Sequence, residues 1–186
     1  MKLIVLTAPS GAGKTTIARR LMAEVPVLRF SVSATTRPPR AGEQNGVDYF
    51  FLAPEAFAER IGAGEFVEYE EVYPGRFYGT LKSEVERLAR DGAALLDVDV
   101  KGALNVKRLY GDRALTLFIQ PPSLAELAER LRRRGTDGAD QIQQRLERAK
   151  MELAYAREFD HTVVNDDLER AVAETVGLAR TFLAAA

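Results

Sequence analysis

A short apolar segment followed by a glycine-rich turn and a lysine is the feature that most constrains this chain. Residues 2–7 read KLIVLT, and residues 8–15 read APSGAGKT. A buried strand, a loop of small residues ending in Lys-Thr, and a following helix are the context that a P-loop requires. Backbone N–H groups in such a loop and at the helix start cradle phosphate oxygens. The segment therefore predicts a site for nucleotide phosphates.

The residues of this loop have separate expected roles. Lys14 supplies a positive charge at the β- and γ-phosphates, and the Thr15 hydroxyl can ligate Mg²⁺. The general pattern begins with Gly where this chain has Ala8, and Ala tolerates a positive φ less well. The alternative is a glycine-rich turn with a chance lysine. The expected nucleotide contacts are Ala8, Pro9, Ser10, Gly11, Ala12, Gly13, Lys14, Thr15 and Thr16.

Strand and helix patterns alternate along the rest of the chain. Apolar or alternating segments predict strands at residues 28–32, 49–52, 66–72, 93–100, 115–120 and 161–164, and residues 33–48 have a loop composition. Helical spacing fills most of the intervals, with Thr80 as the expected cap of a helix that ends at Gly92. This rhythm predicts an α/β fold: a three-layer core with a mostly parallel sheet covered on both faces.

Two carboxylates close the apolar run at residues 93–96. If Asp97 and Asp99 both lie on the strand, their side chains project to the same side. Such a pair at the carboxyl edge of a sheet suits Mg²⁺ or its water ligands. The alternative is that they cap the helix that follows near Gly102.

Two arginines lie in a proline-stiffened loop, SATTRPPRAGE at residues 33–43. The guanidinium groups of Arg37 and Arg40 match phosphate oxygens bidentately, and Tyr49 and Tyr78 can add hydroxyl donors. A solvated surface loop is the alternative for such a pair.

Together with this loop, a series of motifs resembles the guanylate kinase family. They are SATTRPPRAGE (33–43), GVDYF (46–50), EFVE (65–68), FYGT (77–80), LDVD (96–99), RRGT (133–136) and VNDD (164–167). They follow the family's order over nearly the whole chain. The resemblance implies Mg²⁺-dependent transfer of the ATP γ-phosphate to GMP, and to dGMP, in purine metabolism, with a P-loop core, an inserted GMP-binding lobe and a small lid.

The resemblance also implies a set of acceptor-binding residues. Arg37, Arg40, Tyr49 and Tyr78 would hold the GMP phosphate, and the remaining positions are Ser33, Glu43, Glu68, Gly79, Thr80 and Asp99. Glu68 can accept hydrogen bonds from guanine N1–H and the exocyclic amine. Adenine presents an acceptor at N1, so an ionised Glu68 would reject it.

A basic cluster precedes Gly135. The resemblance implies that Arg134 and, on the next helix, Arg145 approach the ATP phosphates when a lid closes, with Arg130 and Asn165 on the ATP side. For the basic cluster the alternative is a solvated helix face, and for Asn165 the alternative is a turn residue before the last helix.

The expected division is a core of residues 1–32, 79–133 and 146–186, a GMP-binding lobe of residues 33–78, and a lid of residues 134–145. The catalytic set is Lys14, Asp97, Arg134 and Arg145, with Thr15 and Asp97 as metal ligands.

Composition limits the other classes. The 186 residues carry a net charge of −1, no Cys, and no apolar run long enough to span a bilayer. We therefore expect one cytoplasmic domain, a monomer or homodimer, without a nucleic-acid or membrane partner and without a disulfide or zinc site. Two other functions remain open at this stage: a catalytically silent module that binds phosphopeptides, and a P-loop kinase for another phosphorylated acceptor such as a ribose bisphosphate.

Overall fold

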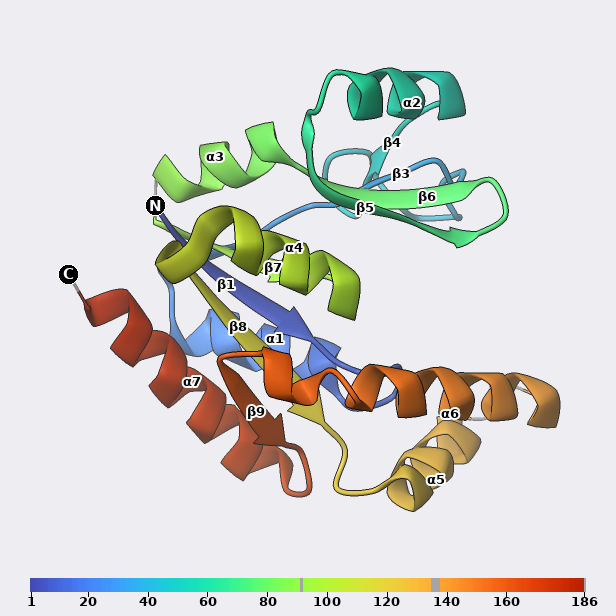
Figure 1. Cartoon of the computed structure of the whole chain (residues 1–186), viewed down its shortest axis with the longest axis vertical. Coiled ribbons are helices and arrows are strands. Elements are labelled where there is room, and N and C mark those ends of the chain that lie inside the picture. Colours follow the sequence, from blue (N-terminus) through green and yellow to red (C-terminus); the bar gives the residue numbers. More distant parts are fainter. Residues whose placement is uncertain (91, 135–137, 186) are drawn as a thin grey trace.

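The computed structural model of the chain describes residues 1–90, 92–134 and 138–185, which form two sheets flanked by helices (Figure 1). The larger sheet is parallel throughout, in the order β2-β7-β1-β8-β9. Its strands are β1 (Lys2–Thr7), β2 (Leu28–Phe30), β7 (Ala93–Asp97), β8 (Ala114–Gln120) and β9 (His161–Val164). Because the strands are parallel, their carboxyl ends share one edge, and pairing of Leu6 with Asp97 brings the P-loop and this carboxylate together.

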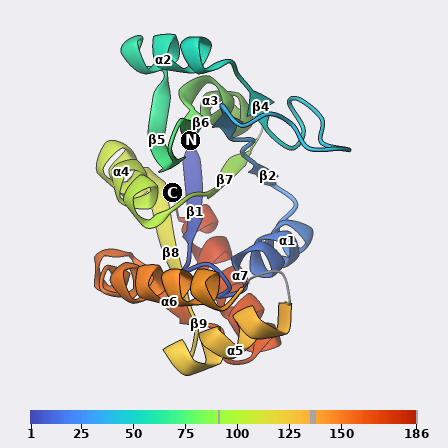
Figure 2. The ribbon, with the colours of Figure 1, turned by 90° about the vertical axis from the view of Figure 1, so that its right-hand side faces the viewer.

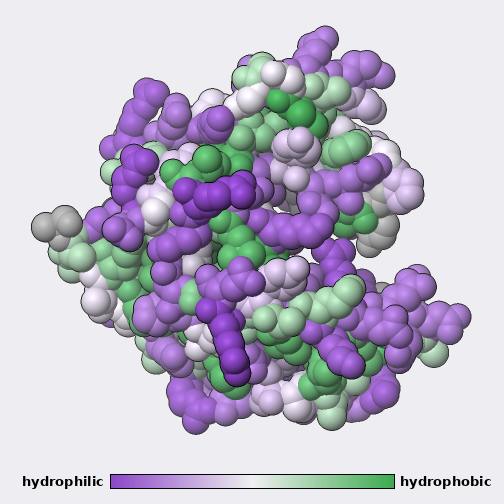
Figure 3. Space-filling view, in the orientation of Figure 1, coloured by the Kyte–Doolittle hydropathy of each residue, from purple (hydrophilic) through white to green (hydrophobic). Residues whose placement is uncertain are grey.

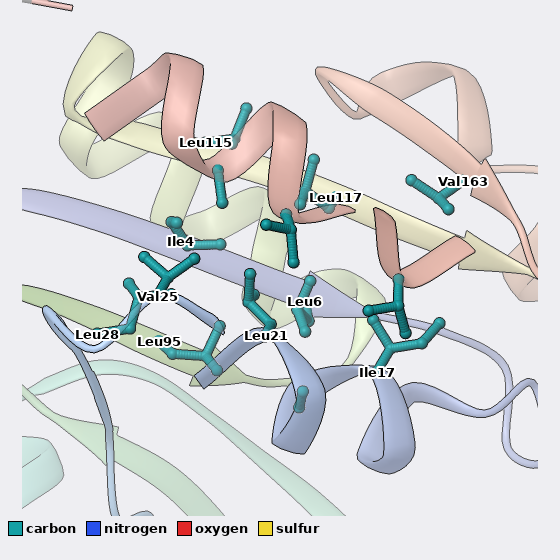
Figure 4. Close-up of a cluster of buried hydrophobic side chains, with 14 of the residues drawn as sticks. Ile4, Leu6, Ile17, Leu21, Val25, Leu28, Leu95, Leu115, Leu117 and Val163 are labelled. Atoms are coloured by element: carbon teal, nitrogen blue, oxygen red, sulfur yellow. The ribbon is translucent and has the colours of Figure 1, made fainter. Parts of the chain in front are cut away.

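Helices cover both faces of the larger sheet. Helices α1 (Lys14–Glu24) and α7 (Leu168–Ala184) bury one face around Ile4, Leu6 and Ile17 (Figure 4). Helices α3 (Lys82–Arg90) and α4 (Val100–Tyr110) cover the other around Leu3 and Val5. Successive side chains of a strand point to opposite faces, so β1 supplies both layers of the core. The predicted three-layer α/β core is confirmed.

A second sheet lies apart from the first, above it in Figures 1 and 2. Its order is β4-β3-β6-β5, with β3 (Ala34–Thr35), β4 (Phe50–Phe51), β5 (Phe66–Tyr73) and β6 (Arg76–Leu81). Helix α2 (Pro54–Gly62) begins at a proline and packs Phe57 on Phe66, with ring centroids 4.4 Å apart. A separate small apolar cluster therefore holds this lobe together.

Two further helices lie beyond the carboxyl ends of β1 and β8 (Figures 1 and 2). They are α5 (Leu124–Arg134) and α6 (Ala139–Leu153), which pack through Leu127, Leu131 and Ala149. Short 3₁₀ turns at Gly111–Arg113 and Ala156–Glu158 complete the chain. Within the described residues, no helix combines the length and apolar character that crossing a membrane requires.

Three local predictions were wrong. Strand β7 ends at Asp97, and Asp99 is instead the N-cap of α4, where its Oδ1 accepts from the Gly102 N–H at 2.8 Å. Thr80 caps no helix, because β6 continues to Leu81 and α3 begins one residue later. The predicted loop at residues 33–48 contains β3, which gains its backbone hydrogen bonds from β4 and β6.

Candidate functional site

A cavity of about 530 Å³ lies between the carboxyl edge of the large sheet, the second sheet and α6. Figure 3 shows the surface indented between the second sheet and the α5–α6 pair, with hydrophilic side chains around the indentation. Its lining comprises Ala8, Pro9, Ser10, Gly11, Gly13, Lys14, Thr15, Thr16, Ser33, Tyr49, Glu68, Glu70, Val72, Tyr78, Gly79, Asp97, Val98, Asp99, Arg145, Arg148 and Glu152. One cavity thus joins most of the predicted P-loop and acceptor residues.

The P-loop has the backbone that an anion cradle needs. Gly11 and Gly13 both have φ of +99°, a region that glycine enters without steric cost. Ala12 N–H donates to the Pro9 carbonyl at 3.0 Å, and Gly13 is the N-cap of α1. In the described part of the chain only glycines have positive φ, so Ala8 carries no backbone strain.

The P-loop lysine is held at the end of β7. Its Nζ forms an ion pair with Asp97 Oδ1 and donates to the Val98 carbonyl at 3.1 Å. Both side chains are about one-fifth exposed, and Thr15 beside them is exposed to the cavity. Lys14, Thr15 and Asp97 therefore form one polar group at the sheet edge.

The segment after β9 supports the P-loop from behind. Asn165 is buried, and its Nδ2 donates to the Ala12 carbonyl at 2.7 Å. Arg130 donates to the Asn165 carbonyl at 3.0 Å and to Glu126 at 3.0 Å. Arg130 also lines a second, more open cavity of about 330 Å³ with Gly11, Gly13 and Arg133. Both residues thus lie beside the P-loop, while contact of Asn165 with a nucleotide stays a prediction.

The arginine loop is ordered by an ion pair. Arg37 is 7% exposed, and its two terminal nitrogens donate to Glu43 at 2.9 and 2.8 Å. Glu43 also accepts from the Arg40 backbone N–H at 2.7 Å. The Arg37 guanidinium and this N–H lower the pKa of Glu43 to about 2, so the pair is ionised throughout the neutral range. The side chain of Arg40 is exposed.

Aromatic residues connect this ion pair to the cavity. The Arg37 guanidinium lies 5.3 Å from the ring centroid of Tyr49, a cation–π distance. Tyr49 in turn meets Tyr78 edge-on, with centroids 5.9 Å apart. Burial raises the pKa of Tyr49, so its hydroxyl keeps its proton and can donate. Arg37, Tyr49 and Tyr78 thus lie together, three of the four residues expected to hold the GMP phosphate with Arg40, and their contact with a phosphate stays a prediction.

A buried carboxylate of the second sheet also lines the cavity. Glu68 on β5 is 8% exposed, and its Oε1 accepts from the Thr80 hydroxyl on β6 at 2.6 Å. Burial, with a smaller contribution from the Asp99 charge, raises the pKa of Glu68 to about 7 against the opposing Thr80 hydrogen bond. Gly79 permits the close approach of the two strands, because a Cβ there would lie 2.8 Å from the Glu68 carbonyl.

Helix α6 contributes residues that the sequence analysis missed. Arg148 and Glu152 line the cavity, their side chains are 2.9 Å apart, and Arg148 Nη2 lies 4.0 Å from Asp99 Oδ2. Their spacing on one helix face with Arg145 was the available signal. Arg145 was predicted, and its Nη1 donates to Ser10 Oγ at 3.2 Å.

Arg134, the other arginine expected to approach the ATP phosphates, is the last residue of α5. Its side chain, and residues 135–137 of the expected lid, lie outside the described residues.

Comparisons with known proteins agree with this geometry. A model of the guanylate kinase family matches residues 1–180. The chain is 60% identical over 181 residues to a guanylate kinase of Salinibacter ruber, covering 97% of this chain and 96% of that protein. It is 53% identical over 172 residues to one from Chlorobaculum tepidum, covering 92% and 88%. The fold is similar to a crystal structure of guanylate kinase from Anaplasma phagocytophilum, with a TM-score of 0.76 and 30% identity over 99% of this chain and 87% of that one.

Proposed function

Because the chain belongs to the guanylate kinase family and phosphorylates GMP to GDP with ATP, we propose that its cavity is divided into an ATP side at the P-loop and a GMP side at the second sheet. The observation that carries this division is the cavity lined both by Lys14, at the start of α1 beside the large sheet, and by Glu68, on β5 of the second sheet. When both substrates are bound in one cavity, the γ-phosphate can pass directly from ATP to GMP in line. The substrates have then already lost their translational and rotational freedom on binding, so little is lost during the reaction itself.

On the GMP side, Arg37, Tyr49 and Tyr78 bind the acceptor phosphate. Their mutual contacts support this role, because the Arg37 guanidinium lies against the Tyr49 ring and Tyr49 meets Tyr78, which places one cation and two phenol side chains together. Arg40 joins them from the exposed end of the loop, and Glu43 orients the Arg37 guanidinium and holds the Arg40 backbone N–H. The acceptor phosphate is already ionised, so the transfer needs no general base.

The Glu68 carboxylate recognises guanine, assisted by Thr80, Ser33 and Asp99. Its two oxygens offer about four acceptor positions, of which the Thr80 hydroxyl uses one. Guanine N1–H and the exocyclic amine can use two more. Adenine would leave the carboxylate facing a lone pair, which is a large penalty in a buried site. Because these proposed contacts of Glu68 are to the base, which GMP and dGMP share, we propose dGMP as a second acceptor.

On the ATP side, the P-loop amides and Lys14 hold the triphosphate, and Arg145 and Arg134 stabilise charge that develops during transfer. The contact of Arg145 with Ser10 supports this, since it brings a cation from α6 to the loop. Arg130 and Asn165 complete the ATP side near the second cavity. Residues 33–78 act as the GMP-binding lobe and residues 134–145 as the lid.

Magnesium fits the residues present. Thr15 and Asp97 are exposed to the cavity and offer the oxygen ligands that Mg²⁺ prefers. In the described ranges, no group of three or more carboxylate or imidazole side chains gathers as a self-sufficient metal site. Mg²⁺ usually keeps several waters and binds through one or two protein ligands plus substrate phosphates, so two protein oxygens suffice here. When bound, Mg²⁺ neutralises phosphate charge during transfer.

The test is an acceptor panel with matched variants. The purified chain with ATP and Mg²⁺ should form ADP with GMP and dGMP, and far less with AMP or a ribose bisphosphate. Lys14→Ala should lower kcat about a hundredfold or more, since it removes charge stabilisation at the transferring group. Lys150→Ala, an exposed lysine on α6, is the control. Equal turnover of GMP and AMP would overturn the assignment of the GMP side.

A further inference from the structure

Gly102 is a glycine inside a helix, where glycine is unfavourable. It is the third residue of α4, it is buried, and its N–H is capped by Asp99. Glycine destabilises a helix relative to alanine because it has more backbone freedom to lose. Glycine is usually needed where the backbone has a positive φ, which other residues adopt only with strain. Gly102 is not among the glycines with a positive φ. Backbone conformation therefore gives no reason for a glycine at this position.

Its surroundings give the reason. A Cβ on Gly102 would lie 2.8 Å from Glu68 Oε2 and 3.1 Å from Glu68 Cδ and Cγ. Real Cβ atoms essentially never come within 3.0 Å of such an atom, so at Oε2 the carboxylate occupies the space that a side chain on residue 102 would fill. By contrast, a Cβ on Gly177 in α7 would meet nothing within 4 Å.

The carboxylate of Glu68 is consequently confined on two sides. Oε1 is held by the Thr80 hydroxyl at 2.6 Å, and Oε2 lies against the first turn of α4 at Gly102. The Glu68 backbone is fixed as well, because β5 approaches β6 closely at Gly79. The position of both oxygens thus depends on two neighbours, one that donates a hydrogen bond and one that leaves room.

We propose that Gly102 is a specificity-determining positioning residue, whose missing side chain sets the orientation in which Glu68 presents both oxygens to the guanine edge of GMP. This rests on the assignment of Glu68 to guanine. Added bulk at position 102 rotates the carboxylate, since its nearest atoms belong to the end of a flexible side chain and not to backbone. The fold is retained while the acceptor geometry changes.

Gly102→Ala tests this, with Gly177→Ala as the matched control for a glycine-to-alanine change in a helix. The expected result for Gly102→Ala is a KM for GMP raised about tenfold or more, because small misplacements in a site are costly. The KM for ATP stays within about twofold, and the melting temperature is unchanged or higher because alanine favours helix. The ratio of kcat/KM for GMP to that for AMP falls. An unchanged KM for GMP would overturn the proposal.

A double-mutant cycle separates the effect on Glu68 from a general disturbance of α4. In a Glu68→Ala background the added methyl has no carboxylate to displace, so Gly102→Ala should change kcat/KM for GMP less than about twofold. If Gly102→Ala lowers kcat/KM for GMP as much in the Glu68→Ala background as in the wild type, the proposal is overturned and the effect belongs to another group, such as Asp99. If Gly102→Ala alone fails to fold, the double variant should fold; failure of both overturns the proposal.

The same cycle distinguishes this inference from the assignment on which it rests. Glu68→Ala alone should reduce discrimination between GMP and AMP. If it does not, Glu68 does not recognise guanine, and both ideas fail. If it does and Gly102→Ala leaves KM for GMP unchanged, only the role of Gly102 fails.

Discussion

The side-chain amide of Asn165 donates a 2.7 Å hydrogen bond to the backbone carbonyl of Ala12, 153 positions earlier in the chain. Both residues are buried. A Cβ on Gly13 would lie 2.3 Å from the same Nδ2, so the amide also requires a glycine there. The segment after β9 therefore fixes the P-loop backbone before any nucleotide binds.

Removing this support should affect ATP more than GMP. In Asn165→Ala the Ala12 carbonyl loses its buried donor, which costs about 1–3 kcal/mol of the free energy of unfolding. A loosened P-loop raises the KM for ATP several-fold and leaves the KM for GMP nearly unchanged. Urea denaturation and initial rates measure the two effects. Asn105→Ala on α4, whose amide oxygen accepts from Arg108, is the control. Equal rises in both KM values would contradict this role.

Recognition of GMP should depend on pH near neutrality. Burial raises the pKa of Glu68 to about 7 in the free protein, and only the ionised form can accept from both guanine donors. The KM for GMP should therefore rise as pH falls from about 8 to about 6, while the KM for ATP responds less. Initial rates across this range measure it. In Glu68→Gln the pH dependence of the KM for GMP should flatten, and a variant that keeps the wild-type dependence would exclude Glu68 as its source.

The same group should make stability fall as pH rises. The pKa of Glu68 is about 7 when folded and 4.5 as the reference for an unfolded chain. Between these values the folded protein holds a proton that the unfolded chain has released, so the free energy of unfolding decreases with increasing pH. The loss is about 3 kcal/mol by pH 7 and then constant. Relative to the wild type, Glu68→Gln should gain stability over this window. If the difference in free energy of unfolding between Glu68→Gln and the wild type does not change from pH 5 to pH 8, the charge of Glu68 is not the source of the pH dependence.

The sequence predicted the core because the core depends on local patterns. The P-loop, the strand at His161–Val164 and the helix that begins at Pro54 follow from apolar spacing and from proline and glycine positions. The second sheet was predicted only in part. Strand β3 has two residues, too few for a period, and its hydrogen bonds come from distant strands.

Side-chain roles in the site were predicted less completely than the residues themselves. The sequence pattern selected Asp99 and Thr80, but whether each caps a helix depends on where the preceding strand ends. The support of the P-loop by Asn165 is a contact between residues far apart in the chain, which has no sequence signal of its own. The contribution of Arg148 was visible only as a charge at helical spacing, a pattern that solvated helix faces share.

Glu43 should act on GMP through Arg37. The carboxylate holds both terminal nitrogens of the guanidinium and the Arg40 backbone. In Glu43→Ala the guanidinium loses this orientation, so the KM for GMP should rise about three- to tenfold with a smaller change in kcat. Initial rates at saturating ATP measure it, and Glu55→Ala, an exposed acid in the first turn of α2, is the control. A KM for GMP equal to the wild-type value would show that Arg37 is positioned without Glu43.

The ion pair between Lys14 and Asp97 should be exchanged for other partners when nucleotide and Mg²⁺ bind. The triphosphate competes for Lys14, and Asp97 is then released to hold the metal or its waters. Asp97→Asn removes a formal negative charge from the metal side. It should raise the Mg²⁺ concentration for half-maximal rate and lower kcat about a hundredfold. Asp112→Asn, in the exposed 3₁₀ turn, is the control. A chelator should stop wild-type turnover and excess Mg²⁺ restore it. An unchanged Mg²⁺ requirement in Asp97→Asn would show that this carboxylate is not part of the metal site and that its role is limited to the ion pair with Lys14.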